Sequence, residues 1–314
     1  MRRYRTLALG AAMLALVMSA CSPGGSGSSS GQASSSQSAS KPDVSVGSAG
    51  FYEAAVVGEM YAQALEAKGY TVERHLEIGE RPAVHAAMDA GEINLIPEYL
   101  GGLAAQLTES AELPSDPQEA WDNLQEPLAA KGWVGFDFSP GTDADGFAVR
   151  QETATDLGLE TMTDVAAVAD QLIWGLAPGC PENPVCGPGL NEVYGIDIDA
   201  VDVETLEPCS AEMADALNTE VVDVAQVCTT QPDIVSFNFK LLDDDMALQP
   251  AQNILGVATQ ELADAAPDDL AETINAINAA LTTEALTQLG VEIVVDQTDM
   301  ADVARTFLED NGLL

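Results

Sequence analysis

The sequence predicts an α/β fold built from two lobes. Segments with a strand pattern alternate with segments whose apolar residues recur at helical spacing. This alternation is broken at residues 140–143, which read Pro-Gly-Thr-Asp, and then starts again. Strands that alternate with helices of ten or more residues favour right-handed crossovers and a mostly parallel sheet covered on both faces. With 46% hydrophobic and 20% charged residues in 314, the chain can bury roughly two domains.

Glycines that follow apolar, helically spaced runs mark the helix ends of the first alternation. Gly69 ends the first predicted helix and Gly91 ends the second. The expected elements are a strand over 44–47, a helix over 51–67, a strand over 71–76, a helix over 82–90, a strand over 93–97, a helix over 117–130 and a strand over 133–138.

The second alternation follows the same rules. Its expected elements are a strand over 147–150, a helix over 162–170, a strand over 173–176, a helix over 210–218 and strands over 221–226 and 237–242. The chain is then expected to close with a strand over 254–258 and helices over 270–281, 283–289 and 300–311.

The first 20 residues have the pattern of a targeting signal. Three arginines precede an apolar run over 6–18, and small residues lead to Cys21. This looks like a bacterial lipoprotein signal peptide over 1–20, after which Cys21 would be diacylated and would hold the chain on the membrane. The alternative is an uncleaved transmembrane anchor. In both cases we expect the rest of the chain on the extracytoplasmic face of the cell membrane, with 21–42 as lipidated cysteine and flexible Ser/Gly tether.

Export also guides the interpretation of the four other cysteines, because disulfides form in oxidising compartments. Zinc would favour closer cysteine spacing and histidine ligands, and the chain has only His75 and His85, so we expect no metal. Three pairings are possible. We favour Cys180 with Cys186, across a Pro/Gly-rich loop, and Cys209 with Cys228, the second less strongly.

The charge and the motifs of the sequence argue against a nucleic-acid-binding protein and against an enzyme. The chain has 51 acidic residues against 11 Lys and Arg, for a net charge of −40, so it cannot form the basic surface that nucleic acid requires. It has no Walker phosphate loop and only two histidines, so we expect neither an enzyme nor a bound cofactor. The acid excess is typical of a solvated surface.

One segment carries a family resemblance. Residues 90–101 read AGEINLIPEYLG, and they follow Val46-Gly47-Ser48, Phe51 and a long helix. Further matching segments are 147–154, 158–159, 163–165, 189–190, 193–195, 222–225 and 303–308. Over about residues 43–314 the chain thus resembles the substrate-binding proteins of osmoprotectant ABC importers of the glycine betaine/carnitine/choline type.

The resemblance implies a type II periplasmic-binding-protein architecture with two chain crossovers. Lobe 1 would comprise 43–143 plus 251–314 and lobe 2 would comprise 144–250. A small solute would bind in the cleft, and lobe closure would present it to the membrane permease and ATPase subunits of the importer. We expect a monomer.

The family's aromatic box for a quaternary ammonium is depleted in this sequence. The resemblance places Tyr99 and Phe51 at box positions, but Asp145, Cys228 and Gln252 stand where aromatics are usual, Ser48 opens a loop that lacks the usual lysine, and Gly102 replaces a hydroxyl residue. The remaining candidate ligand residues are Tyr52, Phe147, Thr229, Thr230 and Gln231. The ligand is expected to be a small osmoprotectant-like solute, a quaternary or other amine. Because the box is depleted, the alternative is a non-betaine polar solute such as an amino acid or amine, which can donate hydrogen bonds.

Overall fold

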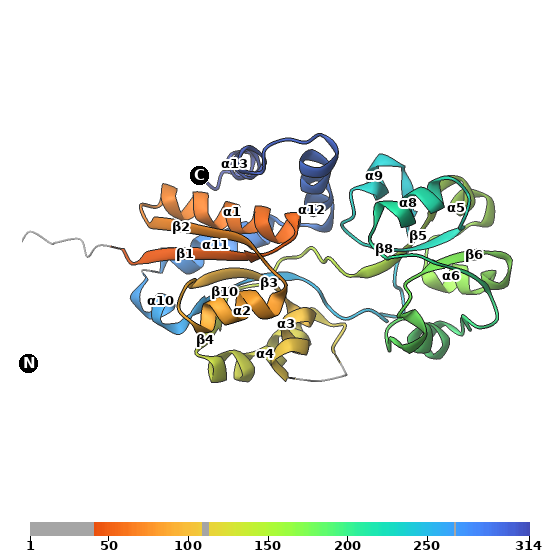
Figure 1. Ribbon diagram of the computed structural model, residues 1–314, viewed down its shortest axis with the longest axis horizontal. Coiled ribbons are helices and arrows are strands. Elements are labelled where there is room, and N and C mark those ends of the chain that lie inside the picture. The colour runs from red at the N-terminus through yellow and green to blue at the C-terminus, as the bar shows by residue number, and fades with distance from the viewer. Residues whose placement is uncertain (1–40, 109–112, 267) are drawn as a thin grey trace, which may run out of the picture. The chain divides into compact units, whose positions relative to one another are not determined.

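The structure, a computed structural model, describes residues 41–108, 113–266 and 268–314, which hold two five-stranded sheets (Figure 1). The first sheet has the strand order β2-β1-β3-β10-β4, and the second has the order β7-β6-β8-β5-β9. The strands are β1 (Asp43–Ala49), β2 (Thr71–Gly79), β3 (Leu95–Tyr99), β4 (Trp133–Gly135), β5 (Asp145–Arg150), β6 (Ile173–Leu176), β7 (Asp202–Thr205), β8 (Val224–Cys228), β9 (Phe239–Leu241) and β10 (Ile254–Thr259). Lobe 1 denotes the elements around the first sheet, and lobe 2 denotes those around the second.

Both sheets are mixed, so the expectation of mostly parallel sheets is wrong. β1 pairs in parallel with β2 and β3, and β6 pairs in parallel with β7 and β8. β10 runs antiparallel to β3 and β4, and β5 runs antiparallel to β8 and β9. Ile254 at the start of β10 pairs with Tyr99 at the end of β3, so the chain enters this sheet at the edge where β3 ends and must run in the opposite direction.

Helices cover both faces of the first sheet. One face packs against α1 (Tyr52–Ala67), α11 (Asp269–Ala280), α12 (Thr283–Gly290) and α13 (Met300–Asp310), and the other packs against α2 (Arg81–Asp89), α3 (Leu100–Thr108) and α4 (Pro117–Lys131). α10 (Gln260–Ala265) follows β10. The helices of lobe 2 are α5 (Gln151–Leu157), α6 (Met162–Ala166), α7 (Gly187–Gly189), α8 (Ala211–Asn218) and α9 (Asp233–Ser236). The helix expected over 162–170 is shorter than predicted and is followed by a separate 3-10 turn, Ala169–Gln171.

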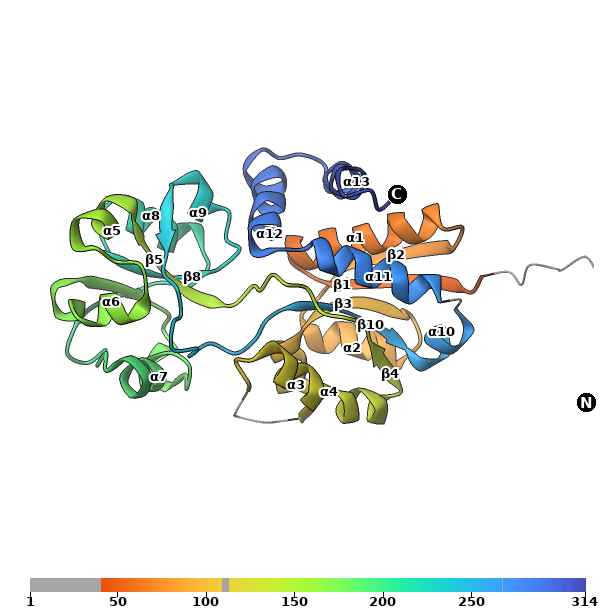
Figure 2. The ribbon, with the colours of Figure 1, turned by 180° about the vertical axis from the view of Figure 1, so that it is seen from behind.

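Two chain segments connect the sheets, and they lie side by side (Figure 2). Thr142 and Asn253 form an isolated antiparallel bridge, and the Asp143 amide donates a hydrogen bond of 3.2 Å to the Gln252 carbonyl. The expected lobe boundaries, after residue 143 and before residue 251, fall within these crossovers. The exact boundaries stay a prediction.

Two disulfides lie in lobe 2. Cys180 is bonded to Cys186 and Cys209 is bonded to Cys228, which are the two favoured pairings. In the part of the chain that the structure covers, no helix combines the length and apolar character that crossing a bilayer requires. The expected signal peptide over 1–20, Cys21 and most of the tether lie outside the described residues.

Candidate functional site

The ends of strands from both sheets meet at the crossovers. Phe51 and Tyr52 follow β1, Tyr99 ends β3, Asp145 begins β5, and residues 229–231 follow β8. Ligand crevices in α/β sheets lie beyond the carboxyl ends of parallel strands. The fold therefore brings candidate residues from distant parts of the sequence to one edge.

A buried carboxyl group lies at this edge in the first turn of α1. Glu53 is 2% exposed, and its Oε1 accepts a hydrogen bond of 2.7 Å from the Tyr99 hydroxyl. Its Oε2 is also buried and has no hydrogen-bond partner of ordinary geometry among the described residues, and the side chains of Thr230 and Asp143 lie close to the same carboxyl group. The Tyr99 ring stands 5.8 Å from the ring of Phe51, which is 42% exposed. An acceptor oxygen and two aromatic faces thus lie close together.

Three carboxyl groups of this region hold their protons unusually tightly. Burial raises the pKa of Glu53 to about 8, the negative charge of Asp143 adds to the rise, and the hydroxyls of Tyr99 and Thr230 oppose it. Burial likewise raises the pKa of Asp143 and of Asp145. Such a desolvated acidic cluster favours either a bound proton or a bound cation.

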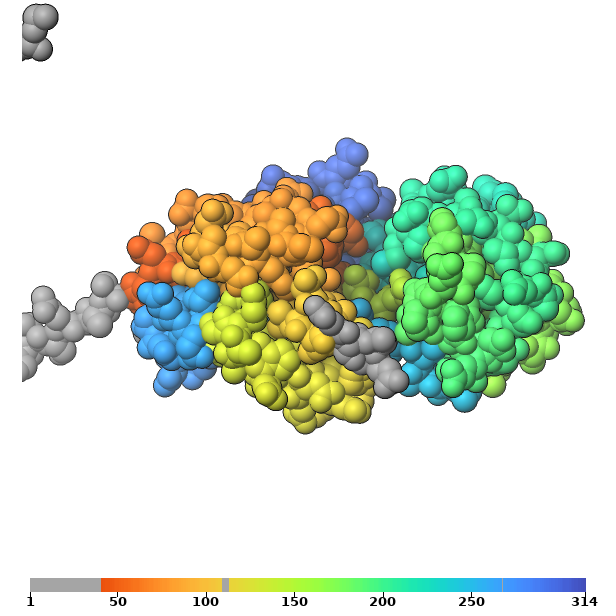
Figure 3. Space-filling model, turned by 60° about the horizontal axis from the view of Figure 1, so that its bottom comes forward, coloured from red at the N-terminus to blue at the C-terminus, as the bar shows by residue number. Residues whose placement is uncertain are grey.

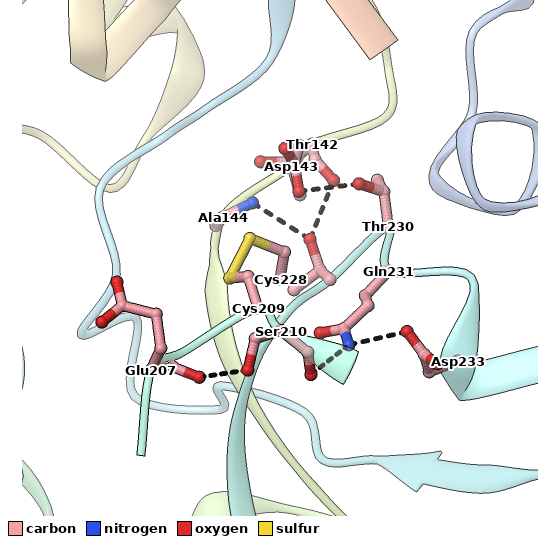
Figure 4. Close-up of a disulfide and its surroundings, with 11 residues drawn as sticks. Thr142, Asp143, Ala144, Glu207, Cys209, Ser210, Cys228, Thr230, Gln231 and Asp233 are labelled. Carbon is pink, nitrogen blue, oxygen red and sulfur yellow. Dashed lines mark hydrogen bonds between the residues drawn. A yellow bond between two sulfur atoms is a disulfide. The ribbon is translucent and has the colours of Figure 1, made fainter. Parts of the chain in front are cut away.

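The side chains that follow β8 hold the crossover in place (Figure 4). Thr229 Oγ1 donates a hydrogen bond of 3.0 Å to the Thr142 carbonyl and accepts one of 3.0 Å from the Ala144 amide. Thr230 Oγ1 donates to Asp143 Oδ1 at 2.7 Å. Thr229 and Thr230 therefore connect lobe 2 to the first crossover.

Gln231, the third of these residues, is directed back into lobe 2. Its Nε2 donates to Asp233 Oδ2 at 2.8 Å and to the Ser210 carbonyl at 3.3 Å. Its amide nitrogen is thus engaged within lobe 2.

Tyr52 lies next to these residues. Burial and the charges of Glu53, Asp143 and Asp233 raise its pKa, while the Thr230 hydroxyl opposes the rise. A phenol with this pKa stays protonated, so it remains able to donate a hydrogen bond.

Ser48 and Gly102 have structural partners in lobe 1. Ser48 Oγ accepts from the Glu77 amide at 2.9 Å and donates to the Ala49 carbonyl at 3.1 Å. The Gly102 amide donates to Gln252 Oε1 at 3.0 Å. A Cβ at Gly102 would lie 2.4 Å from Arg81 Nη2, so only glycine lets the guanidinium lie over the start of α3.

Arg81 lies against Gly102, and its charge is balanced by Glu98. Its Nε donates to both carboxylate oxygens of Glu98, at 3.1 and 2.9 Å. His85 Nε2 lies 2.7 Å from Glu98 Oε1. A ligand carboxylate would therefore meet a guanidinium whose charge Glu98 already offsets through Nε.

Phe147 lies away from the strand ends, in the core of lobe 2. It is 3% exposed and packs edge-to-face against Trp174 with ring centroids 5.8 Å apart. Asp145 lies at the surface of a cavity of about 410 Å³ beside the crossovers, together with Thr142 and Thr229. A carboxylate oxygen of Asp145 and the sulfurs of Cys209 and Cys228 lie within 4.8 Å of one another, but these sulfurs are bonded to each other and are not metal ligands.

A larger groove of about 860 Å³ lies between α2, α3 and α4. Figure 3 shows the side of the molecule to which α4 belongs. None of the expected ligand residues lines the groove. Because this groove lies on outer helices and away from the strand ends, it is a weaker candidate for the solute site than the region around Glu53.

Glu53 and Asp143 were missed by reasoning from the sequence. An acid in the first turn of a helix is ordinarily explained by the helix dipole, and Asp143 was not expected to be a ligand residue although it stands at the strand ends that border the crevice. A carboxyl directly after two aromatic residues at the end of a strand is the one signal that points to Glu53.

Comparisons with known proteins show which family of proteins this chain is similar to. A family model described as the substrate binding domain of ABC-type glycine betaine transport systems matches residues 42–310. The carnitine transport binding protein OpuCC of Listeria monocytogenes is 27% identical over 310 residues, which cover 95% of this chain and 92% of that protein. The glycine betaine-binding protein YehZ of Escherichia coli K12 is 23% identical over 283 residues, which cover 86% of this chain and 90% of that protein.

Solved structures show the same fold. The crystal structure of a glycine betaine/carnitine/choline ABC transporter protein superposes with a TM-score of 0.80 at 25% identity and covers 86% of this chain and 99% of that one. Apo YehZ of E. coli superposes with a TM-score of 0.77 at 21% identity and covers 87% of this chain and 99% of that one.

Proposed function

Because this chain belongs to the family of substrate-binding domains of ABC-type glycine betaine transport systems, we propose that it captures a small organic amine for an ABC importer. Its α/β fold with two mixed sheets matches the type II periplasmic binding proteins, as the resemblance implied. The observation that carries the proposed ligand class is Glu53, a buried carboxyl whose second oxygen has no donor within the described residues.

An ammonium group fits this arrangement for two reasons. Its positive charge offsets the raised proton affinity of Glu53, Asp143 and Asp145. Its N–H groups can donate to Glu53 Oε2, whereas a fully methylated ammonium has no N–H to give. Leaving a buried acceptor unsatisfied costs about 1–3 kcal/mol.

The aromatic contribution is smaller than a full box would give. Phe51, Tyr52 and Tyr99 remain, while Asp145 and Gln252 offer polar groups and Cys228 is part of a disulfide. Each cation–π face contributes about 0.5–2 kcal/mol, so the loss of two or three faces weakens quaternary ammonium binding by one to several powers of ten. The relatives named for carnitine and glycine betaine support an ammonium ligand in general.

A ligand carboxylate is expected to weaken binding. The site presents three carboxyl groups, and the nearby Arg81 is already paired with Glu98. Small amines without a carboxylate are thus the favoured class, and amino acids are the alternative.

Delivery of the solute to the importer would depend on closure of the two lobes about the two crossovers. The antiparallel bridge between Thr142 and Asn253 holds these segments together, so they can act as one hinge. A ligand favours closure only by the free energy that it gains from touching both lobes at once. Glu53 and Tyr99 of lobe 1 and Thr230 of lobe 2 are the proposed contacts.

The expected location follows from residues 1–40. We propose that residues 1–20 are cleaved as a signal peptide and that Cys21 is diacylated. The protein would then be a monomer that its tether links to the extracytoplasmic face of the membrane. In a detergent phase-partition assay the cell-derived protein should enter the detergent phase, and Cys21→Ser should shift it to the aqueous phase. A Cys21→Ser protein that stays in the detergent phase would argue for the uncleaved transmembrane anchor.

A thermal-shift panel tests the receptor role. Ethanolamine, choline, glycine betaine, carnitine, amino acids and polyamines would be compared, and a ligand at 100 times its dissociation constant should add about 2.7 kcal/mol of stability. We expect the primary amines to stabilise the protein without being chemically changed. Turnover of a bound solute, or no shift with any member of the panel, would contradict the proposal.

A further inference from the structure

We propose that the Cys209–Cys228 disulfide positions the lobe-2 side of the solute site, so that opening it lowers solute affinity. This inference rests on the proposed function. The geometry that supports it is the placement of Cys228 between two site segments. Cys228 is the last residue of β8, pairs with Asp145 across the sheet, and directly precedes Thr229 and Thr230.

The turn after β8 depends on the position of Cys228. Thr229 joins the Thr142 carbonyl to the Ala144 amide. Thr230 donates a hydrogen bond to Asp143, as Figure 4 shows. A shift of Cys228 would move both hydroxyls relative to the crossover. It would therefore also change the surroundings of the Asp143 carboxyl.

The other end of the disulfide is fixed to the start of α8. Cys209 has a φ of 55°, a left-handed conformation that a residue with a Cβ rarely adopts and that needs support from its surroundings. The next residue, Ser210, caps α8 by accepting a hydrogen bond of 3.1 Å from the Met213 amide. The Ser210 carbonyl also accepts from Gln231 Nε2 at 3.3 Å. The disulfide and Gln231 are thus two parallel connections between the α8 entry and the turn after β8.

The second disulfide offers a matched control. Cys180 and Cys186 are each 1% exposed and belong to the core of lobe 2 under a loop of their own. Cys209 and Cys228 are partly exposed. Since thiol–disulfide exchange requires access to sulfur, a dithiol should open the Cys209–Cys228 pair first in the folded protein.

The chemistry of opening is ordinary exchange. One thiolate of dithiothreitol attacks a sulfur of the pair and the S–S bond breaks. The second thiol of the reagent then closes it into its own cyclic disulfide, and the two protein sulfurs leave as thiols. Two electrons and two protons pass from the reagent to the protein.

The test measures ethanolamine affinity by titration calorimetry on the oxidised protein, on the folded protein after mild dithiothreitol treatment, and after reoxidation. Alkylation and mass spectrometry identify the opened cysteines. We expect at least tenfold weaker binding when Cys209 and Cys228 are free, and recovery on reoxidation. The Cys180→Ser/Cys186→Ser variant should bind within twofold of the parent protein.

A double-mutant cycle separates positioning from general stabilisation. Thr230→Val should weaken ethanolamine binding at least tenfold in the oxidised protein, but less than threefold in the Cys209→Ser/Cys228→Ser background or in the reduced protein. Additive losses would show that the disulfide does not act through Thr230 and would overturn the inference. Equal affinity of oxidised and reduced protein would also overturn it, whereas failure of the oxidised protein to bind any solute would overturn the proposed function itself.

Discussion

The Tyr99 hydroxyl donates a 2.7 Å hydrogen bond to Oε1 of Glu53, which ties the end of β3 to the first turn of α1. This bond fixes the carboxyl plane and occupies one of its two oxygens. The other oxygen is buried beside Asp143 and Thr230 and has no donor within the described chain. We propose that a solute ammonium group completes this arrangement.

Glu53→Gln tests the proposed acceptor. The amide keeps the shape of the side chain and an oxygen for Tyr99 but cannot ionise when an ammonium group binds, so we expect ethanolamine binding to weaken at least tenfold in calorimetry. Glu66→Gln, on the exposed end of the same helix, should leave affinity within twofold, because its ion pair with Arg74 is solvent-exposed. Unchanged affinity in folded Glu53→Gln would remove Glu53 from the site.

The pH dependence of stability tests the environment of the same residue. The folded-state pKa of Glu53 is raised to about 8, so below about pH 4.5 both folded and unfolded chains hold the proton and the contribution to stability is complete. As pH rises towards 8 the unfolded chain loses its proton first, so the free energy of unfolding should fall, by at most about 1.4 kcal/mol per pH unit for this group.

Urea unfolding of the parent protein and of Glu53→Gln between pH 5 and 8 measures this slope. The variant should show a shallower decline, with Asp143 and Asp145 supplying the remainder in the same direction. Identical slopes for the two proteins would show that Glu53 ionises normally.

Tyr99 is expected to line the site. Tyr99→Ala removes both the aromatic face and the hydrogen bond to Glu53, so ethanolamine affinity should fall by about 1 kcal/mol or more, which is at least fivefold. Tyr99→Phe keeps the ring and should lose less. If Tyr99→Ala stays folded by circular dichroism and binds within about twofold of the parent, the placement is wrong.

The first crossover is packed tightly against lobe 1 at Gly141. A Cβ there would lie 2.5 Å from backbone atoms of Thr282 and Thr283, so Gly141→Ala should destabilise the protein by about 1–3 kcal/mol in urea unfolding. Gly179→Ala is the matched control, since nothing lies within 4 Å of its added Cβ. If the two variants have the same free energy of unfolding, the crossover adjusts to the added methyl group at residue 141 without loss of stability.

The helices and strands that the sequence predicted well are those with strong periodicity. β6 was predicted over the same residues that the structure shows, and α12 was predicted to begin at the residue where it does begin. β7 was missed because all four of its residues are exposed and show no alternation. α3 was missed because Gly101 and Gly102 weaken its helical pattern, and Gly102 is needed for the approach of Arg81.

The direction of β5 and β10 could not be predicted, because antiparallel pairing depends on the edge at which the chain re-enters a sheet and not on local pattern. For a related reason, only part of the candidate site could be predicted from the sequence. Tyr99 and Phe51 were found through the family resemblance, and the structure brings their rings within 5.8 Å. Glu53 and Asp143 were not distinguished among the 51 acids, because their burial and the hydrogen bond from Tyr99 to Glu53 come from the folded arrangement.

The most direct test of the account is calorimetry of ethanolamine against glycine betaine on the same protein at neutral pH. Ethanolamine has four non-hydrogen atoms, so its affinity can reach on the order of tens of micromolar. Glycine betaine lacks N–H donors and brings a carboxylate to an acidic site, so it should bind more weakly, at high micromolar or poorer. Submicromolar binding of glycine betaine would contradict the account and would show that Phe51, Tyr52 and Tyr99 suffice as an aromatic box.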